Sequence, residues 1–247
     1  MKFLALWLLL TAFVCAQDAI PRGTVLPAQL NSSLDSRKTP SGERIMARVM
    51  QDVPLAGGKK LRAGAKLIGH VVRVQPASSV QPAEIAIRFE FVKSGKRSIP
   101  VTTNLRAMAS LMEVEDAQTP KTGPDRGTPW AWVTRNLVGG QVAYGNGGPV
   151  ARGSDVVGEV VVDGVLARVA ANPRAGCRGA ADQDDRPQAL WVFSSDACGL
   201  YGYPEMQIAH AGRTTPVGEI TLASPANFII RRGGGILLRV NASATEE

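Results

Sequence analysis

The chain has 247 residues and a formal net charge of +7, and 45% of its residues are hydrophobic and 20% charged. This composition excludes global disorder, and a chain of this length buries one large core or two smaller ones. Aromatic residues are scarce, at 5%, and no catalytic or cofactor motif stands out in the sequence.

The N-terminus predicts the compartment. Lys2 precedes an apolar run from Phe3 to Ala16, which is typical of a secretory signal peptide. The run is shorter than the ~20 residues that span a bilayer. A lipidated Cys15 is disfavoured, because Val14 stands where that processing signal requires a small residue. We therefore expect residues 1–16 to be cleaved off after Ala16, leaving a secreted or periplasmic chain with no transmembrane segment.

Cleavage leaves two cysteines, Cys177 and Cys198. In an oxidising compartment an isolated pair most often forms a disulfide, and a bridge across a loop of this length contributes about 3 kcal/mol. The alternative is a metal site that adds His210 to the two thiolates. It is disfavoured, because it offers three ligands and no C-x-x-C spacing. We expect a disulfide, no metal and no cofactor.

The first half of the mature chain has the pattern of strands. Between Glu84 and Val92, apolar side chains alternate with polar or small ones, which predicts a half-buried strand with Ile85, Ile87, Phe89 and Phe91 on its core face. The turn at Ser94-Gly95 predicts a hairpin. Residues 104–117 suit either one short helix or an extension of the preceding strand, and residues 118–129 predict a linker. The strands expected in this half are 23–30, 44–53, 66–74, 84–92 and 97–103.

The second half also predicts strands separated by glycine-rich turns, and Asp163-Gly164 is a strong hairpin signal. The fold class is therefore all-β, mainly antiparallel and barrel- or sandwich-like, with at most one short helix. The expected strands are 136–144, 155–169, 189–194, 217–223, 227–231 and 235–240. The expected domains are a basic β-barrel-like module at 19–117, the linker, a second β module with one disulfide at 130–242 and a disordered tail at 243–247.

The positive charge belongs to the first module. Residues 17–121 carry 16 basic and 9 acidic side chains, whereas residues 122–247 carry 11 and 12. Nucleic acid is disfavoured as a partner, since only Phe89 and Phe91 in the basic half could stack on bases. An anionic envelope polymer or a protein partner fits better. The candidate patch for such a partner is Lys59, Lys60, Arg62, Lys66, Lys93, Lys96 and Arg97.

Aromatic residues cluster between 188 and 213. They suit either a binding surface or, as we prefer, the core of a module poor in large side chains. The candidate binding surface is Trp191, Phe193, Tyr201, Tyr203, His210 and Arg213. Ser194, Ser195, Asp196 and His210 have the residue types of a hydrolase triad, but no G-x-S-x-G elbow surrounds either serine. We therefore assign no catalytic residue.

Three apolar stretches, GTVLPAQL at 23–30, ARVMQDV at 47–53 and LRAGAKLIG at 61–69, resemble the opening strands of a known family domain. It is the C-terminal β-barrel domain of conjugation and type IV secretion scaffold proteins. Nothing after Lys121 matches that family. The segments ALWVFSSDACGLYGY at 189–203 and HAGRTTPVGEI at 210–220 resemble secreted bacterial β-rich proteins. Both resemblances imply a bacterial envelope protein and supply no catalytic residues.

These observations favour a non-enzymatic structural or binding protein of the envelope. The alternatives are an envelope hydrolase that acts on wall polymer and an accessory component of a secretion or conjugation machine. The sequence leaves open the ligand, the oligomeric state and the strand order.

Overall fold

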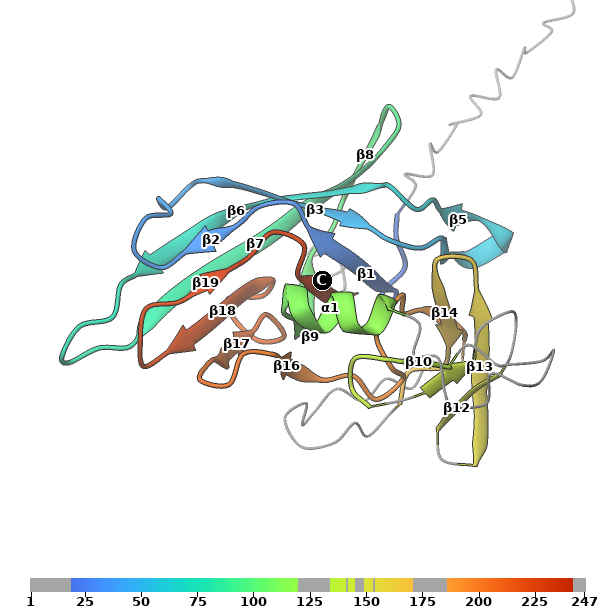
Figure 1. The fold of residues 1–247 in the computed structure, drawn as a ribbon. Coiled ribbons are helices and arrows are strands. Elements are labelled where there is room, and N and C mark those ends of the chain that lie inside the picture. Colours follow the sequence, from blue (N-terminus) through green and yellow to red (C-terminus); the bar gives the residue numbers. More distant parts are fainter. Residues whose placement is uncertain are drawn as a thin grey trace, which may run out of the picture.

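The computed structural model describes residues 19–119, 134–140, 142–144, 149–152, 154–170 and 186–241 (Figure 1). Half of the described residues are in strands, and the one α-helix among them is short, so the prediction of an all-β fold is confirmed. The predicted signal peptide and the tail at 243–247 lie outside the described residues.

A ten-stranded sheet forms the larger part of the structure. Its strands run in the order β16-β9-β20-β1-β3-β6-β7-β18-β17, and β8 pairs with the C-terminal end of β7. All these pairs are antiparallel except β16 with β9. The strands are β1 (Val25–Leu30), β3 (Arg44–Val49), β6 (Lys66–Gln75), β7 (Ala83–Ser94), β8 (Arg97–Pro100), β9 (Thr103–Ala109), β16 (Gly199–Tyr201), β17 (Gln207–Ala211), β18 (Glu219–Ser224) and β20 (Gly235–Val240).

The alternation along β3 shows how the large sheet divides its faces. Ile45, Ala47 and Val49 are buried, whereas the side chains between them are exposed. The buried set belongs to the main hydrophobic core, together with residues of β1, β6, β7, β18 and β20. The period of two therefore places one face of the sheet on the core. We call this the inner face, and the opposite one the outer face.

The large sheet curls without closing. Arg213 lies beyond β17 in the chain and donates from Nη2 to the carbonyl of Leu105 on β9 at 3.3 Å. Asn241 donates from Nδ2 to the carbonyl of Gly212 at 3.1 Å. Side chains therefore bridge two ends of the sheet, but no strand pair of the described residues joins β17 to β9. The expected barrel is replaced by an open, sandwich-like arrangement, because the gap is spanned by side chains instead of a backbone ladder.

A six-stranded sheet packs on part of the outer face. Val25 of β1 and Leu237 of β20 turn away from the main core and contribute to a second core, which also holds Phe193. The sheet order is β10-β11-β12-β13-β14-β15. Its strands are β10 (Thr134–Asn136), β11 (Val142–Tyr144), β12 (Pro149–Arg152), β13 (Asp155–Val161), β14 (Gly164–Ala167) and β15 (Gln188–Ala189).

The helix α1 (Leu111–Gln118) also packs into this second core through Val114 and Ala117. It begins at Ser110, whose hydroxyl accepts the backbone N–H of Glu113 at 3.4 Å. A serine at the N-cap with glutamate three residues later is a favoured helix start. Two short pairs complete the structure: β2 (Leu34–Asp35) with β19 (Ile229–Ile230), and β4 (Val53–Pro54) with β5 (Lys60–Leu61), which flank a 3-10 turn at Ala56–Gly58.

The segment 104–117 contains both of the structures considered for it, because β9 covers its first half and α1 its second. The predicted strand at 189–194 is wrong. Only Ala189 belongs to a strand, and the chain then turns at Trp191, whose φ of 51° is incompatible with a strand. The predicted linker at 118–129 is described only as far as residue 119.

The sheets do not divide the chain at residues 118–129. Four strands from the predicted second module, β16, β17, β18 and β20, belong to the large sheet with β1 to β9. β20 pairs with both β1 and β9. The segment that forms the second sheet is therefore inserted between strands of the first.

Candidate functional site

A buried glutamine fixes the junction between the two sheets. Gln51 lies just after β3 and is 1% exposed. Its side-chain oxygen Oε1 accepts the backbone N–H of Trp191 at 2.7 Å, and its Nε2 donates to the carbonyl of Val165 on β14 at 2.9 Å. Burying an amide without partners is costly. Both ends of the Gln51 amide thus have partners, and both partners belong to the inserted segment.

Trp191 occupies a strained turn. Its φ is 51°, and the turn is closed by the N–H of Phe193, which donates to the carbonyl of Leu190 at 2.8 Å. Glycine is the usual residue where the first central position of a turn has positive φ. A non-glycine residue in this region costs about 1–3 kcal/mol. The hydrogen bond from Trp191 to Gln51 helps to hold this conformation.

The close approach at this junction also explains Gly164. A Cβ at Gly164 would lie 2.5 Å from Gln51 Oε1 and 2.6 Å from the Cα of Trp191, too close for any side chain. The predicted hairpin is confirmed, but its two-residue turn is Val162-Asp163, one residue earlier than predicted, since Val161 of β13 pairs with Gly164 of β14. Gly164 is therefore the first residue of β14, and the close packing against Gln51 and Trp191 requires a glycine there.

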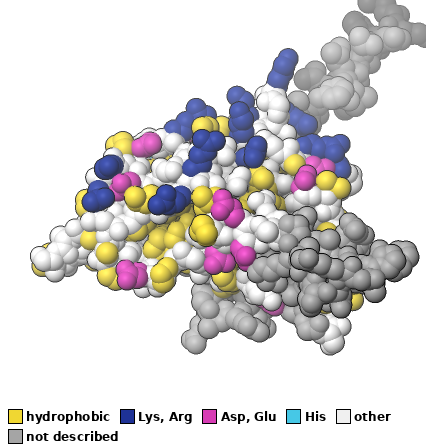
Figure 2. Space-filling model, viewed as in Figure 1, with side chains coloured by type: hydrophobic (Ala, Val, Ile, Leu, Met, Phe, Trp, Pro, Cys, Tyr) yellow, Lys and Arg dark blue, Asp and Glu magenta, His cyan; other side chains and the backbone are white. Residues whose placement is uncertain are grey.

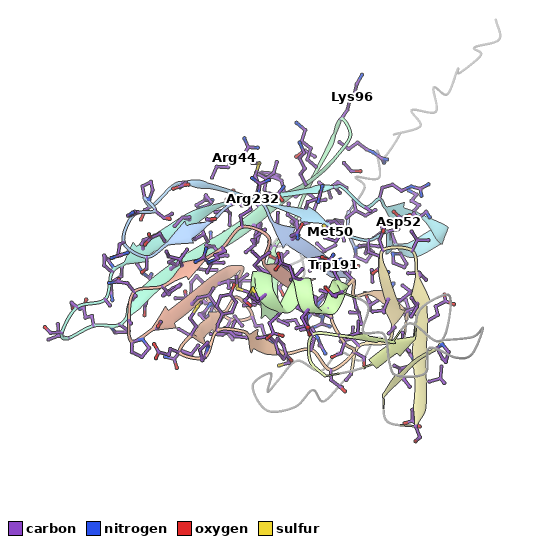
Figure 3. The ribbon with its side chains drawn as sticks, in the orientation of Figure 1. Arg44, Met50, Asp52, Lys96, Trp191 and Arg232 are labelled. Carbon is purple, nitrogen blue, oxygen red and sulfur yellow. The ribbon has the colours of Figure 1, made fainter. Side chains whose placement is uncertain are left out.

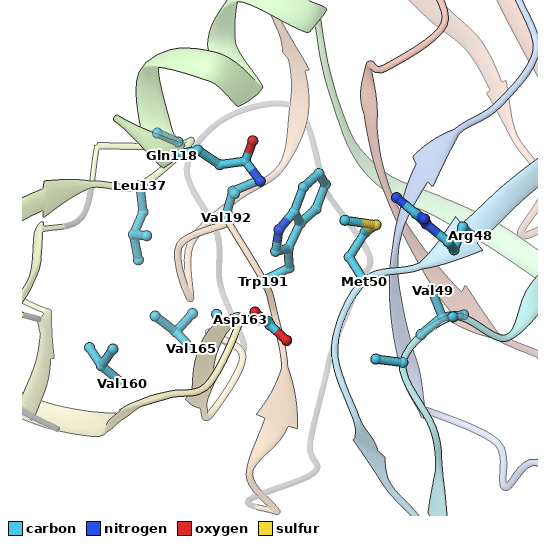
Figure 4. A pocket seen from close by; sticks show the side chains of 14 residues that line it. Arg48, Val49, Met50, Gln118, Leu137, Val160, Asp163, Val165, Trp191 and Val192 are labelled. Atoms are coloured by element: carbon cyan, nitrogen blue, oxygen red, sulfur yellow. The ribbon is translucent and has the colours of Figure 1, made fainter. Parts of the chain in front are cut away.

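A pocket of about 470 Å³ opens at this junction (Figure 4). Such a volume is within the range of small-molecule sites. Trp191 lies in the pocket between Met50 and Val192, and the charged side chains are Arg48 and Asp163. Trp191 is only 3% exposed, so its ring forms part of the wall and leaves no face open for stacking. The remaining walls are provided by Val49, Ala63, Gly64, Ala117, Gln118, Leu137, Val160, Gly164 and Val165.

Arg48 also begins a row of cations across the outer face of the large sheet. In the strand register Arg48 of β3 lies opposite Lys66 of β6, and Lys66 lies opposite Lys93 of β7. All three side chains are exposed. They have no acidic partner among the described residues. We call Arg48, Lys66 and Lys93 the cationic row.

Like charges directly opposite one another destabilise a sheet. The cationic row therefore lowers the stability of the sheet, and no acidic side chain among the described residues compensates for it. Most Lys and Arg side chains in view lie along the upper side of the molecule, over β3, β6 and the β7–β8 hairpin (Figure 2). Arg44 and Lys96 project from the same side (Figure 3). Four residues of the predicted basic patch, Lys66, Lys93, Lys96 and Arg97, thus belong to β6 and the β7–β8 hairpin of the large sheet.

Further along β6 and β7 the basic side chains do have acidic partners. Arg73 lies 3.2 Å from Glu84, Arg88 lies 3.5 Å from Glu219, and His70 lies 3.3 Å from Glu90. On β6 and β7, the basic side chains without an acidic partner among the described residues are therefore Lys66 and Lys93.

Three residues of the predicted patch lie at the β4–β5 hairpin instead. Asp52 lies 2.8 Å from Lys60 Nζ and 3.0 Å from Arg62 Nη1, and it accepts the backbone N–H of Ala63 at 2.9 Å. These contacts, that of Lys60 foremost, lower the pKa of Asp52 to about 2. Lys60 and Arg62 are thus engaged by a carboxylate. Lys59 is exposed next to them, and Lys96 and Arg97 lie at the β7–β8 turn.

The predicted aromatic surface is divided between separate places. Phe193 is fully buried and makes an edge-to-face contact with Trp191, at 6.5 Å between ring centroids. Tyr201, on β16, accepts the backbone N–H of Cys198 with its hydroxyl at 2.9 Å. Tyr203 lines a second, shallower hollow, and burial raises its pKa to about 12. Arg213 instead bridges to β9 at the open end of the large sheet.

His210 does not assemble a triad. Its Nδ1 lies 2.6 Å from the carbonyl oxygen of Glu219, and its Nε2 lies 3.1 Å from the hydroxyl of Thr214. Ser194 and Ser195 are fully buried in the turn after Trp191. Within the described residues, His210 contacts neither serine. The arrangement therefore gives the hydrolase alternative no support.

Cys177 lies outside the described residues, so its pairing with Cys198 stays a prediction. Sequence reasoning missed Arg48, Gln51 and the pocket. The alternation along β3 was a usable signal for Arg48, since it places Arg44, Met46 and Arg48 on one face. Gln51 had no such signal, because its partners are 114 and 140 residues away in the chain.

Within the described ranges, no group of three or more His, Cys, Asp or Glu side chains could hold a metal ion. No helix in the same ranges is long and apolar enough to cross a membrane. No protein-family model matches the chain, and no curated protein matches its sequence.

Proposed function

We propose that this protein is a non-enzymatic binding component of the bacterial envelope, exported by its N-terminal signal peptide, and that its outer sheet face binds an anionic partner. The observation that carries the proposal is the cationic row. Lys66 lies directly opposite Lys93, and Arg48 lies on the other side of Lys66.

An anionic ligand relieves the repulsion within the row, so binding recovers the stability that the unliganded sheet gives up. The row crosses three neighbouring strands, which lie about 5 Å apart. This spacing suits a ligand that presents several negative charges on an extended surface. Arg48 also borders the pocket beside Trp191, so a ligand held on the row lies next to that opening.

The test uses poly-L-glutamate as a soluble polyanion. The double variant Lys66→Gln/Lys93→Gln should bind it about two- to thirtyfold more weakly than the wild type, since exposed ion pairs contribute about 0.2–1 kcal/mol each. A charge-matched control, Lys38→Gln/Arg168→Gln, removes two exposed cations outside the row and should lose much less affinity. Equal losses in the two variants would show that binding depends on net charge alone, and the proposal would be wrong.

The same double variant has a second readout. Removing two opposed like charges should leave the melting temperature unchanged or raise it. Weaker binding with retained stability is the combination expected of a binding surface. A marked loss of stability in Lys66→Gln/Lys93→Gln would instead show that these lysines support the fold.

A further inference from the structure

An apolar row lies beside the cationic row on the same face. In the register Met46 of β3 lies opposite Ile68 of β6, Ile68 opposite Phe91 of β7, and Phe91 opposite Pro100 of β8. Met46 is 36% exposed and Phe91 is 42% exposed. We call these four residues the apolar row.

Cations lie on both sides of the apolar row. On one side lies the cationic row, whose members are two residues away from Met46, Ile68 and Phe91 along their strands. On the other side, Arg44 lies opposite His70, and His70 is paired with Glu90. Arg44 is exposed and has no acidic partner within the described part of the chain. The face therefore presents exposed apolar side chains between positive charges.

The β7–β8 hairpin extends this face. Phe91 and Pro100 are paired at its base, Lys93 and Ser98 are paired closer to the turn, and Lys96 projects at its tip, clear of the rest of the sheet (Figure 3). Thus the strands that carry Phe91 and Pro100 continue into a cationic tip.

A soluble anionic polymer would use the cations and leave the exposed Phe91 in water. A bilayer of anionic lipids uses both rows, since its headgroups attract Lys and Arg while its interface accepts aromatic and aliphatic side chains. Charge complementarity and the adjacent apolar row together therefore favour a lipid surface over a polymer.

We propose that the outer face of β3, β6, β7 and β8 binds the surface of an anionic phospholipid bilayer. The cationic row lies against the lipid phosphates, and Phe91 and Met46 enter the headgroup region. This inference rests on the proposed function, because it names the anionic partner of the same face.

The test is flotation of the full chain with vesicles. Vesicles of phosphatidylglycerol and phosphatidylcholine in equal parts should bind the wild type, and vesicles of phosphatidylcholine alone should bind it at least tenfold more weakly, since each cation near an anionic surface contributes about fivefold. Lys66→Gln/Lys93→Gln should lose affinity both for the anionic vesicles and for poly-L-glutamate.

The variant Met46→Ser/Phe91→Ser separates the two proposals. It should bind the anionic vesicles about tenfold more weakly than the wild type, because it removes apolar side chains that enter the interface, and its binding of poly-L-glutamate should not change. The matched control is Val80→Ser/Val162→Ser, which changes two residues that are 84% and 85% exposed in the β6–β7 and β13–β14 connections, outside the strands of this face. This control should bind vesicles as the wild type does.

Two results would overturn the inference while leaving the proposed function intact. One is binding of the wild type to poly-L-glutamate but not to anionic vesicles, which would favour a polymer or an acidic protein. The other is equal vesicle binding by Met46→Ser/Phe91→Ser and its control. Failure of the wild type to bind either probe would overturn both proposals.

Discussion

The side-chain oxygen of Gln51 accepts the backbone N–H of Trp191 at 2.7 Å, although the two residues are 140 positions apart in the chain. This bond ties the inserted segment to the end of β3. It also holds Trp191 at a φ of 51°, in a turn where glycine is the usual residue. The part of the pocket wall that Trp191 forms therefore depends on the buried side-chain amide of Gln51.

We expect Gln51→Ala to lower the free energy of unfolding by about 1–3 kcal/mol, because it leaves the N–H of Trp191 and the carbonyl of Val165 without their partner. Urea unfolding measures this change. Gln118→Ala is the control, since Gln118 lines the same pocket but is exposed, and its effect should stay within about 0.5 kcal/mol. Equal stabilities of the two variants would contradict the role of Gln51.

Asp52 should titrate at about pH 2 in the folded protein, well below its usual value. Because the folded pKa is lowered, the contribution of Asp52 to stability is complete above about pH 4 and is lost as the pH falls through about 2. The carboxyl carbon shift in an NMR titration measures the midpoint. Lys60→Met should raise it, since Lys60 is the main cause of the shift, whereas Lys93→Met should not. A midpoint near pH 4 in the wild type would refute the contacts of Asp52 with Lys60, Arg62 and the backbone of Ala63.

Tyr203 provides a pH dependence at the alkaline end. Burial raises its pKa to about 12, so the unfolded chain, with a tyrosine pKa of about 10, loses the phenolic proton first. The contribution to stability is complete below about pH 10 and is lost as the pH rises towards 12. Unfolding free energies of the wild type and Tyr203→Phe should therefore diverge over this range. Parallel pH profiles would contradict this account.

The predicted bridge between Cys177 and Cys198 is tested on protein purified from the periplasm. Mass spectrometry of peptides prepared without reduction should find the two cysteines linked, and reduction should lower stability by about 3 kcal/mol. Two free thiols in that protein would refute the disulfide.

Local patterns predicted much of the fold. The all-β class, the strands β1, β3, β6 and β7 and the hairpins at residues 94–97 and 161–164 could be predicted from alternation and turn residues. The division into two modules did not match the sheets, because the pairing of β20 with β1 and β9 joins distant parts of the chain. No local pattern specifies such pairing.

The candidate site could be predicted only in part. Lys66 and Lys93 were in the predicted patch, but their direct opposition needs the β6–β7 register, which contains bulges. Phe91 was expected to face the core with Ile85, Ile87 and Phe89. A register shift between Ile68 and Gly69 separates Phe89 from Phe91, and Phe91 is exposed while Phe89 is buried. A single extra residue in a strand moves the later side chains of that strand to the opposite face.

The central claim is that the cationic row forms an anion-binding surface. The most direct measurement is the affinity for poly-L-glutamate across a series of salt concentrations, for the wild type, Lys66→Gln/Lys93→Gln and Lys38→Gln/Arg168→Gln. We predict tight, salt-sensitive binding by the wild type and the control, and weaker binding with a shallower salt dependence when the row is neutralised. Identical salt dependence in all three proteins would contradict the claim.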